Sequence, residues 1–153
     1  MKNNQTITDL DLNFTLLSCK GIEKISPAFE LNKTLKILNL SGIYQIYFNL
    51  FHQENNISSD GFLYLSSGLM KNEIIEELYL DENNCIDKGR LSLFQWLNIT
   101  KSLKVLSLSR TKLFKNKGAN LLSEMLELNN SIKKLNISSK LIHIYLFYLI
   151  FFN

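Results

Sequence analysis

A short pattern that recurs five times along the chain sets the strongest limit on its fold. Each copy reads apolar-x-x-Leu-x-apolar, and the five copies begin at Ile7, Leu35, Ile75, Leu103 and Ile132. The copies start 28, 40, 28 and 29 residues apart, and removing residues 43–54 shortens the interval of 40 to 28. Residues 43–54 are therefore interpreted as an insert in a repeat of 28 or 29 residues.

The second half of each unit repeats as well. A glycine follows each of the first four copies, at Gly21, Gly61, Gly89 and Gly118. Two apolar residues four positions apart come after each glycine, namely Ile25 and Phe29, Leu65 and Leu69, Leu93 and Leu97, and Leu122 and Leu126. Three units close with an asparagine just before the next copy, at Asn32, Asn72 and Asn129.

These periods predict one strand and one helix in each unit. Leu-x-Leu alternation puts both leucines on one face of a strand, and apolar residues four apart form a stripe on a helix of about three turns. One unit cannot bury its apolar face alone, whereas stacked units can bury theirs against each other. We therefore expect an α/β protein with parallel strands on one side, helices on the other, and the glycines where neighbouring units crowd.

These landmarks together resemble the ribonuclease-inhibitor class of leucine-rich repeat. Units of that class read Leu-x-x-Leu-x-Leu-x-x-Asn-x-Leu, followed by a glycine and an amphipathic helix. The resemblance covers roughly residues 7–42 and 55–140. It implies a leucine-rich repeat solenoid with a curved parallel sheet on the concave side and helices on the convex side. The class serves inhibitors, immune sensors, tropomodulin-like caps and Ran GTPase-activating proteins, so it does not define one function.

The resemblance also implies domain limits and a structural ladder. The domain spans residues 1–140, with repeats at 7–34, 35–74, 75–102 and 103–131 and a partial fifth at 132–140. The class places asparagine, cysteine or threonine after each strand, where the side chain satisfies backbone groups. Here the ladder residues are Thr15, Asn55, Asn83 and Thr111, while Lys140 in the fifth unit has no acceptor for this role.

Two segments do not fit the repeat. They are the insert 43–54 and the apolar tail 141–153, and residues 43–54 and 141–152 together hold nine of the 16 Phe and Tyr residues. Three interpretations stay open: a functional loop with a docking tail, a membrane anchor, or translated non-coding sequence. The tail and the uncapped ends of the array could also allow self-association, and the chain could be a fragment of a longer array.

The sequence offers no pattern for catalysis or for a cofactor. His52 and His143 have no acid or nucleophile spaced to pair with them, and Cys85 occupies an apolar position that predicts a core thiol. There is no Gly-x-Gly-x-x-Gly and no Walker loop. The acidic pairs 76–77 and 81–82 alternate across a strand, which argues against a metal site. We therefore expect no enzyme activity, metal, cofactor or small-molecule substrate.

Composition and charge exclude several further classes of protein and partner. A hydrophobic share of 46% excludes a disordered chain, and two cysteines exclude a disulfide-rich scaffold. A net charge of +3 with two arginines argues against nucleic acid. The N-terminus has no apolar core for a signal peptide, and no apolar run reaches the roughly 18 residues of a membrane span. The expected location is the cytoplasm, with no membrane association.

The remaining candidate site is the set of strand residues between the leucines, which should face outward on the concave surface. An acidic row there lies beside a basic row, with Tyr79 as the central aromatic side chain, and tyrosine and arginine often anchor interfaces. The candidate binding residues are Glu77, Tyr79, Asp81, Glu82, Lys104, Ser107, Arg110, Lys134 and Asn136.

We accordingly expect a non-catalytic protein–protein interaction module that binds a protein partner on its concave face. One alternative is a GTPase-activator-like regulator of a small GTPase, because the repeats resemble those of Ran GTPase-activating proteins. Such proteins carry a functional arginine in a post-strand loop, and Arg110 is the only arginine near such a position. Another is a fragment of a larger leucine-rich repeat receptor or scaffold.

Overall fold

Strands and helices alternate along the chain in the computed structural model, which describes residues 3–15, 17–42, 57–111, 113 and 118–138. The strands are β1 (Asp9–Asp11), β2 (Ile37–Asn39), β3 (Glu77–Tyr79), β4 (Val105–Ser107) and β5 (Lys134–Asn136). The helices are α1 (Cys19–Leu31), α2 (Ser59–Leu69), α3 (Asp87–Ile99) and α4 (Gly118–Leu128). The insert, Asn55, Lys140, the tail and both histidines lie outside the described residues, so the expectations for them stay predictions.

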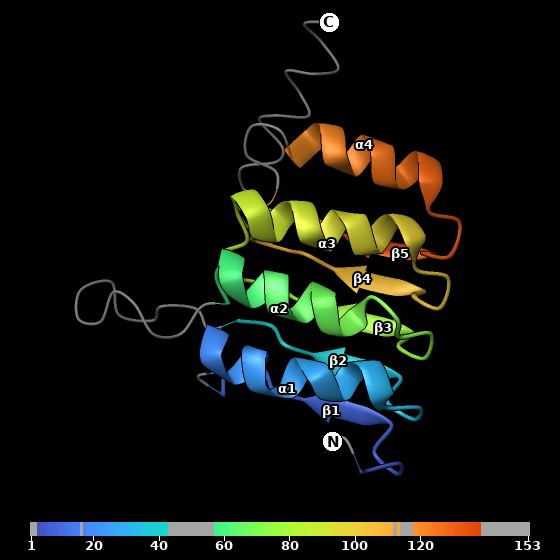
Figure 1. Cartoon of the computed structure of the whole chain (residues 1–153). Coiled ribbons are helices and arrows are strands. Elements are labelled where there is room, and N and C mark those ends of the chain that lie inside the picture. Colours follow the sequence, from blue (N-terminus) through green and yellow to red (C-terminus); the bar gives the residue numbers. More distant parts are fainter. Residues whose placement is uncertain (1–2, 16, 43–56, 112, 114–117, 139–153) are drawn as a thin grey trace, which may run out of the picture.

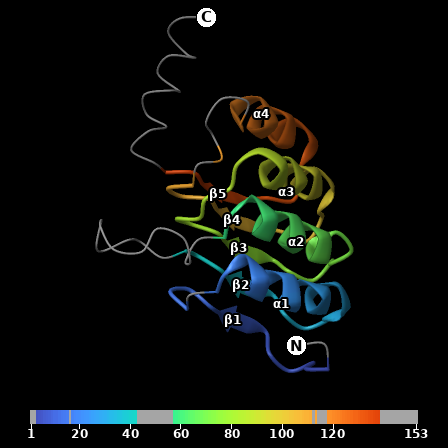
Figure 2. The ribbon, with the colours of Figure 1, turned by 60° about the vertical axis from the view of Figure 1, so that its left-hand side comes forward.

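The five strands form one parallel sheet in the order in which they follow along the chain. The middle leucine of each strand pairs in register with that of the next, from Leu10 through Leu38, Leu78 and Leu106 to Leu135. Figures 1 and 2 show the four helices side by side on one face of this sheet. The α/β fold with a parallel sheet and a helix layer, predicted from the repeat, is confirmed.

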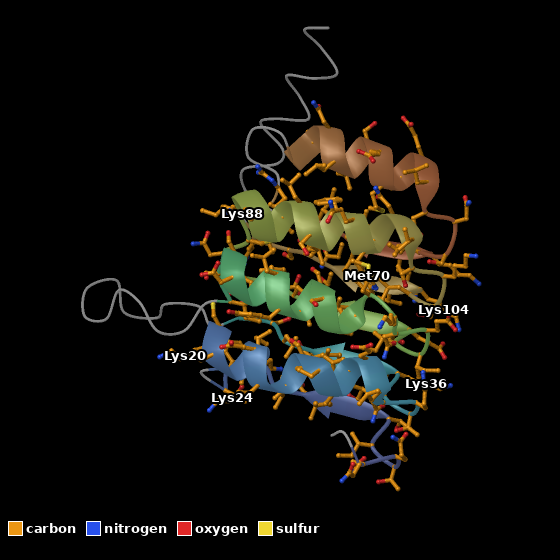
Figure 3. All side chains as sticks on the ribbon, viewed as in Figure 1. Lys20, Lys24, Lys36, Met70, Lys88 and Lys104 are labelled. Carbon is orange, nitrogen blue, oxygen red and sulfur yellow. The ribbon has the colours of Figure 1, made fainter. Side chains whose placement is uncertain are left out.

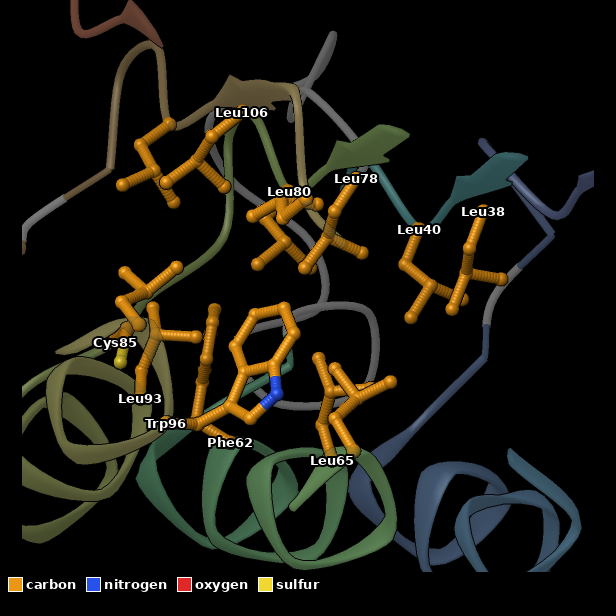
Figure 4. Close-up of a cluster of buried hydrophobic side chains, with 14 of the residues drawn as sticks. Leu38, Leu40, Phe62, Leu65, Leu78, Leu80, Cys85, Leu93, Trp96 and Leu106 are labelled. Atoms are coloured by element: carbon orange, nitrogen blue, oxygen red, sulfur yellow. The ribbon is translucent and has the colours of Figure 1, made fainter. Parts of the chain in front are cut away.

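The core lies between the sheet and the helices. Leucines from the strands point down onto apolar side chains of the helices, and Phe62 and Trp96 fill the space between them (Figure 4). Burial of this apolar surface is the main force holding the layers together. Cys85 belongs to the same cluster, as predicted, and burial raises the pKa of its thiol far above its ordinary value.

Glycines at the helix starts lie at crowded positions. At Gly89 the crowding comes from the neighbouring unit, as the repeat suggested, whereas at Gly118 it comes from the same unit. A Cβ atom at Gly89 would collide with the backbone of Ser59, at the beginning of α2. A Cβ atom at Gly118 would likewise collide with the backbone oxygen of Leu113. Glycine therefore allows the start of a helix to approach backbone that a side chain would push away.

The helix α4 departs from the expected pattern. Leu126 was expected to be buried, but 58% of it is exposed, whereas Met125 is 1% exposed and faces the core. Leu121 and Leu122 are both half-buried against the core. Among the described elements, α4 has a helix neighbour on one side only, so its rotation is set by contact with α3. The stripe therefore runs through Leu121 and Met125, one residue before the predicted pair.

Asparagines before the strands form a polar row, in which Asn72 is buried and Asn129 is half-buried. The side-chain oxygen of Asn72 accepts hydrogen bonds from the N–H groups of Ile74 and Ile75, each at 2.9 Å, and its nitrogen donates to the Phe29 carbonyl at 2.7 Å. Asn129 makes the equivalent bonds to Ser131, Ile132 and Leu97. Asn72 and Asn129 therefore each turn the chain into a strand and tie their unit to the helix of the preceding unit.

Thr100 occupies this position in the third unit. Its hydroxyl is buried and has no hydrogen-bond partner within the described chain. A threonine side chain is shorter than asparagine and cannot offer both an amide nitrogen and a carbonyl oxygen. The row of asparagines is thus interrupted at one unit.

Candidate functional site

The face of the sheet opposite the helices is here named the open face. The first and third residues of each strand alternate with a leucine that packs toward the helices, so their side chains lie on this face. The first-position row is Asp9, Ile37, Glu77, Val105 and Lys134. The third-position row is Asp11, Asn39, Tyr79, Ser107 and Asn136. All four helices lie on the other side of the sheet (Figure 2).

The structure brings the nine candidate binding residues together over β3, β4 and β5. Tyr79, Ser107 and Asn136 are consecutive members of the third-position row. Lys104 comes just before β4, while Glu82 and Arg110 occupy equivalent places in the turns after β3 and β4. The candidate residues thus form one continuous surface.

Tyr79 lies on the central strand and is held by its neighbours. Its hydroxyl donates a hydrogen bond to a carboxylate oxygen of Glu77 at 2.7 Å. This hydrogen bond is the largest cause that raises the pKa of Tyr79 to about 12, and burial is the next. The Tyr79 side chain is therefore neutral and half-buried, and its hydrogen bond to Glu77 fixes its orientation.

Asp81 connects β3 to the units that follow. Its carboxylate accepts hydrogen bonds from the Ser107 hydroxyl at 2.6 Å and from the Ser109 N–H at 2.5 Å. The Ser107 hydroxyl in turn accepts a hydrogen bond from the Asn136 side chain at 3.0 Å. This chain of bonds crosses three strands, so the polar side chains in the middle of the open face are pre-ordered.

Two sets of ion pairs border this centre. Glu76 pairs with Lys104 and, at 3.2 Å, with Lys36, and the hydrogen bond from Lys104 is the largest cause that lowers the pKa of the Glu76 carboxyl. Figure 3 shows Lys36 and Lys104 along the same edge of the molecule. Arg110 pairs with Glu82 at 3.0 Å. Exposed pairs of this kind stabilise a fold by about 0–1 kcal/mol each, so their main effect is to orient side chains.

Lys36 and Glu76 are residues that the sequence-based site did not include. Both sit immediately before a strand, at the position that Lys104 holds in the next unit. The sequence does carry a signal for these contacts, since the charge at this repeat position alternates from Lys36 to Glu76 to Lys104. Equivalent residues of stacked strands lie about 4.8 Å apart, so such charges can pair.

The two ends of the open face carry opposite charges. Asp9 and Asp11 are exposed on β1, and Lys133 and Lys134 are exposed at β5. Asp11 accepts hydrogen bonds from the backbone and side-chain nitrogens of Asn13. Within the described ranges, no ion pair involves any of these four residues. The centre of the face is thus internally paired, whereas its ends present charge outward.

The structural ladder differs between asparagine and threonine. The Asn83 amide nitrogen donates to the carbonyls of Leu40 and Leu80, at 2.8 and 3.1 Å, and its oxygen accepts from the Ile57 N–H at 3.1 Å. Within the described residues, Thr15 donates to the Leu12 carbonyl and Thr111 to the Leu108 carbonyl, each in its own unit. Asn83 therefore links adjacent units, whereas each of these threonine hydroxyls closes a local turn.

The described part of the chain contains no cluster of three His, Cys, Asp or Glu residues able to hold a metal ion. No helix in that same part is both long and apolar enough to cross a membrane.

Comparison with known proteins supports the fold. No model of a known protein family matches the chain, and no curated protein matches its sequence. A solved structure described as leiomodin-1 actin-binding site 2 superposes with a TM-score of 0.74 at 19% identity, over 94% of this chain and 78% of that chain. The C-terminal domain of Caenorhabditis elegans tropomodulin gives 0.71 at 14% identity, over 94% and 80%. The chain therefore has an α/β fold similar to that of leucine-rich-repeat-like domains.

Proposed function

We propose that the chain is a non-catalytic protein-binding module whose partner binds the open face. In this proposal the fold is a leucine-rich repeat solenoid of the ribonuclease-inhibitor-like class, with about four full repeats and a partial fifth. The open face is then the concave face of the solenoid. The cytoplasmic location expected from the sequence belongs to the same proposal.

The observation that carries this proposal is the pre-ordered polar surface around Tyr79. A partner that binds flexible side chains must immobilise them, at a cost of about 0.5–1.5 kcal/mol for each. Here Glu77 holds the tyrosine hydroxyl, and Asp81 holds Ser107. Because these groups are already oriented, less free energy is lost on binding.

The leiomodin-1 structure is described as an actin-binding site, which makes actin the first protein to test. Affinity capture with the full chain should retain its partner from a cell extract, and cross-links should map to the open face. Replacing Glu77, Tyr79 and Arg110 together by alanine should abolish capture.

A matched control replaces Glu23, Tyr64 and Lys88, which present the same kinds of side chain on the outer surface of α1, α2 and α3. This variant should capture the partner as well as the original chain does. Circular dichroism and thermal unfolding confirm that both variants fold. Capture that survives the open-face changes and fails in the control would refute the open face as the binding surface.

The GTPase-activator alternative depends on Arg110. Its guanidinium pairs with Glu82 at 3.0 Å across adjacent turns. This contact orients the arginine along the sheet edge, an arrangement that favours a structural or interface role. A GTP-hydrolysis assay with Ran separates the two functions, since a binding module would leave the hydrolysis rate unchanged.

A further inference from the structure

The first-position row of the open face changes charge from one end to the other. Asp9 stands at the β1 end and Lys134 at the β5 end, and both are exposed. Half-buried Ile37 and Val105 lie one strand to each side of the central strand. The row therefore reads anion, apolar residue, anion, apolar residue and cation, and its middle member, Glu77, accepts the hydrogen bond of the Tyr79 hydroxyl.

We propose that the open face binds a segment of another protein in one fixed direction, with cationic side chains over β1 and anionic side chains over β5. The inference rests on the proposed function and adds the chemistry of the partner. Apolar side chains of the segment contact Ile37 and Val105, and its middle lies over Tyr79.

The spacing of the strands sets the length of this segment. Four intervals of about 4.8 Å separate β1 from β5 by about 19 Å. A helix covers this distance with about 13 residues. Because about 19 Å exceeds the Debye length of about 8 Å at physiological salt, the two ends act independently. A segment bound in the reverse direction thus meets like charges at both ends.

A second copy of this chain fits the same face less well. Two copies stacked face to face with aligned strands would set Asp9 opposite Lys134. The same arrangement brings Lys36 of one copy opposite Lys104 of the other and the two Asp81 side chains together. These like charges favour a different protein as the partner.

The test uses the full chain and two synthetic helix-forming peptides of about 15 residues. One peptide has lysines at one end, glutamates at the other and leucines between them, and the second has the same composition with its charges mixed. Fluorescence anisotropy at about 50 mM salt should show about tenfold tighter binding of the first peptide. At about 1 M salt the preference should disappear.

Charge-reversal variants then test whether the end charges set the direction in which the peptide binds. Asp9→Lys with Asp11→Lys, or Lys133→Glu with Lys134→Glu, should each remove the preference, and all four changes together should restore it. A nitroxide on the cationic end of the peptide should broaden amide signals of β1 in the original chain and of β5 in the fourfold variant. Since Asp11 also accepts bonds from Asn13, Asp9→Lys alone provides a milder variant that keeps the turn.

A control with Glu23→Lys and Lys88→Glu reverses charges on the helices and should keep the preference. Equal binding of both peptides, or no recovery in the fourfold variant, would overturn the fixed direction. If Tyr79→Ala weakens both peptides while the end charges have no effect, the open face still binds and only the direction is wrong. Sedimentation that shows a dimer lost in each double reversal would favour a second copy instead.

Discussion

The two faces of the sheet obey different rules although the same short strands build both. On the helix-covered face, Leu38, Leu78 and Leu106 repeat without change and are fully buried. On the open face, the residue before the middle leucine differs in every unit, from Asp9 to Lys134. The repeated residues therefore build the fold, while the residues that differ between units give each unit its own surface chemistry.

The largest expected effect comes from a pair of adjacent substitutions on opposite faces. Leu78→Ala opens a cavity in the core and should lower the free energy of unfolding by about 2–5 kcal/mol. Tyr79→Ala, one residue away, should lower it by about 1 kcal/mol. Urea unfolding followed by circular dichroism measures both. Equal losses would show that the open face supports the fold as much as the core does.

The next largest change in the free energy of unfolding is expected from the row of asparagines that precede the strands. Asn72→Ala leaves the half-buried N–H group of Ile74 and the buried N–H group of Ile75 without their acceptor and should cost about 1–3 kcal/mol. Thr100→Asn should instead stabilise the chain by about 1 kcal/mol, because it supplies the bonds missing from the third unit. Thermal unfolding of the two variants tests the opposite signs. A destabilising Thr100→Asn would show that this turn has a different geometry.

A smaller, pH-dependent effect belongs to the open face. The pKa of Tyr79 is raised to about 12, from an ordinary value of 10.0. The folded chain thus keeps this proton at pH values where the unfolded chain loses it, so stability should fall as the pH rises from about 10 to about 12. Tyr79→Phe should cost about 0.5 kcal/mol near neutral pH and remove this part of the decline. Unfolding curves across this range for both chains make the comparison.

The smallest expected effect is that of an ion pair at the edge of the open face. Arg110→Ala removes the contact with Glu82, yet it should change the free energy of unfolding by less than about 0.5 kcal/mol. The difference should vanish in about 1 M salt, since exposed charges are screened. A loss as large as that of Asn72→Ala would show that this pair supports the turn and does more than orient a surface side chain.

Much of the fold could be predicted because the repeat encodes local structure and packing together. The Leu-x-Leu pattern, which is Leu-x-Ile in the fifth unit, located each of the described strands, and Leu65, Leu69, Leu93 and Leu97 are buried as expected. The rotation of α4 could not be predicted, because it depends on contact with one neighbouring helix. For the polar side chains, the sequence indicated which of them share a face of the sheet. It did not specify the ion pair of Glu76 with Lys36, because that contact depends on the register of stacked strands.

The sequence by itself determined the order of strands and helices, the buried leucines and the glycines at helix starts, since each follows from a period in the chain. Only the tertiary structure decided that Asn72 ties its unit to the preceding helix and that Met125 is buried in place of Leu126. It also decided that the carboxylates of Glu77 and Asp81 in the middle of the open face accept hydrogen bonds from neighbouring residues, while the charged side chains at its ends are exposed. These features depend on distances between separate units, which no local pattern specifies.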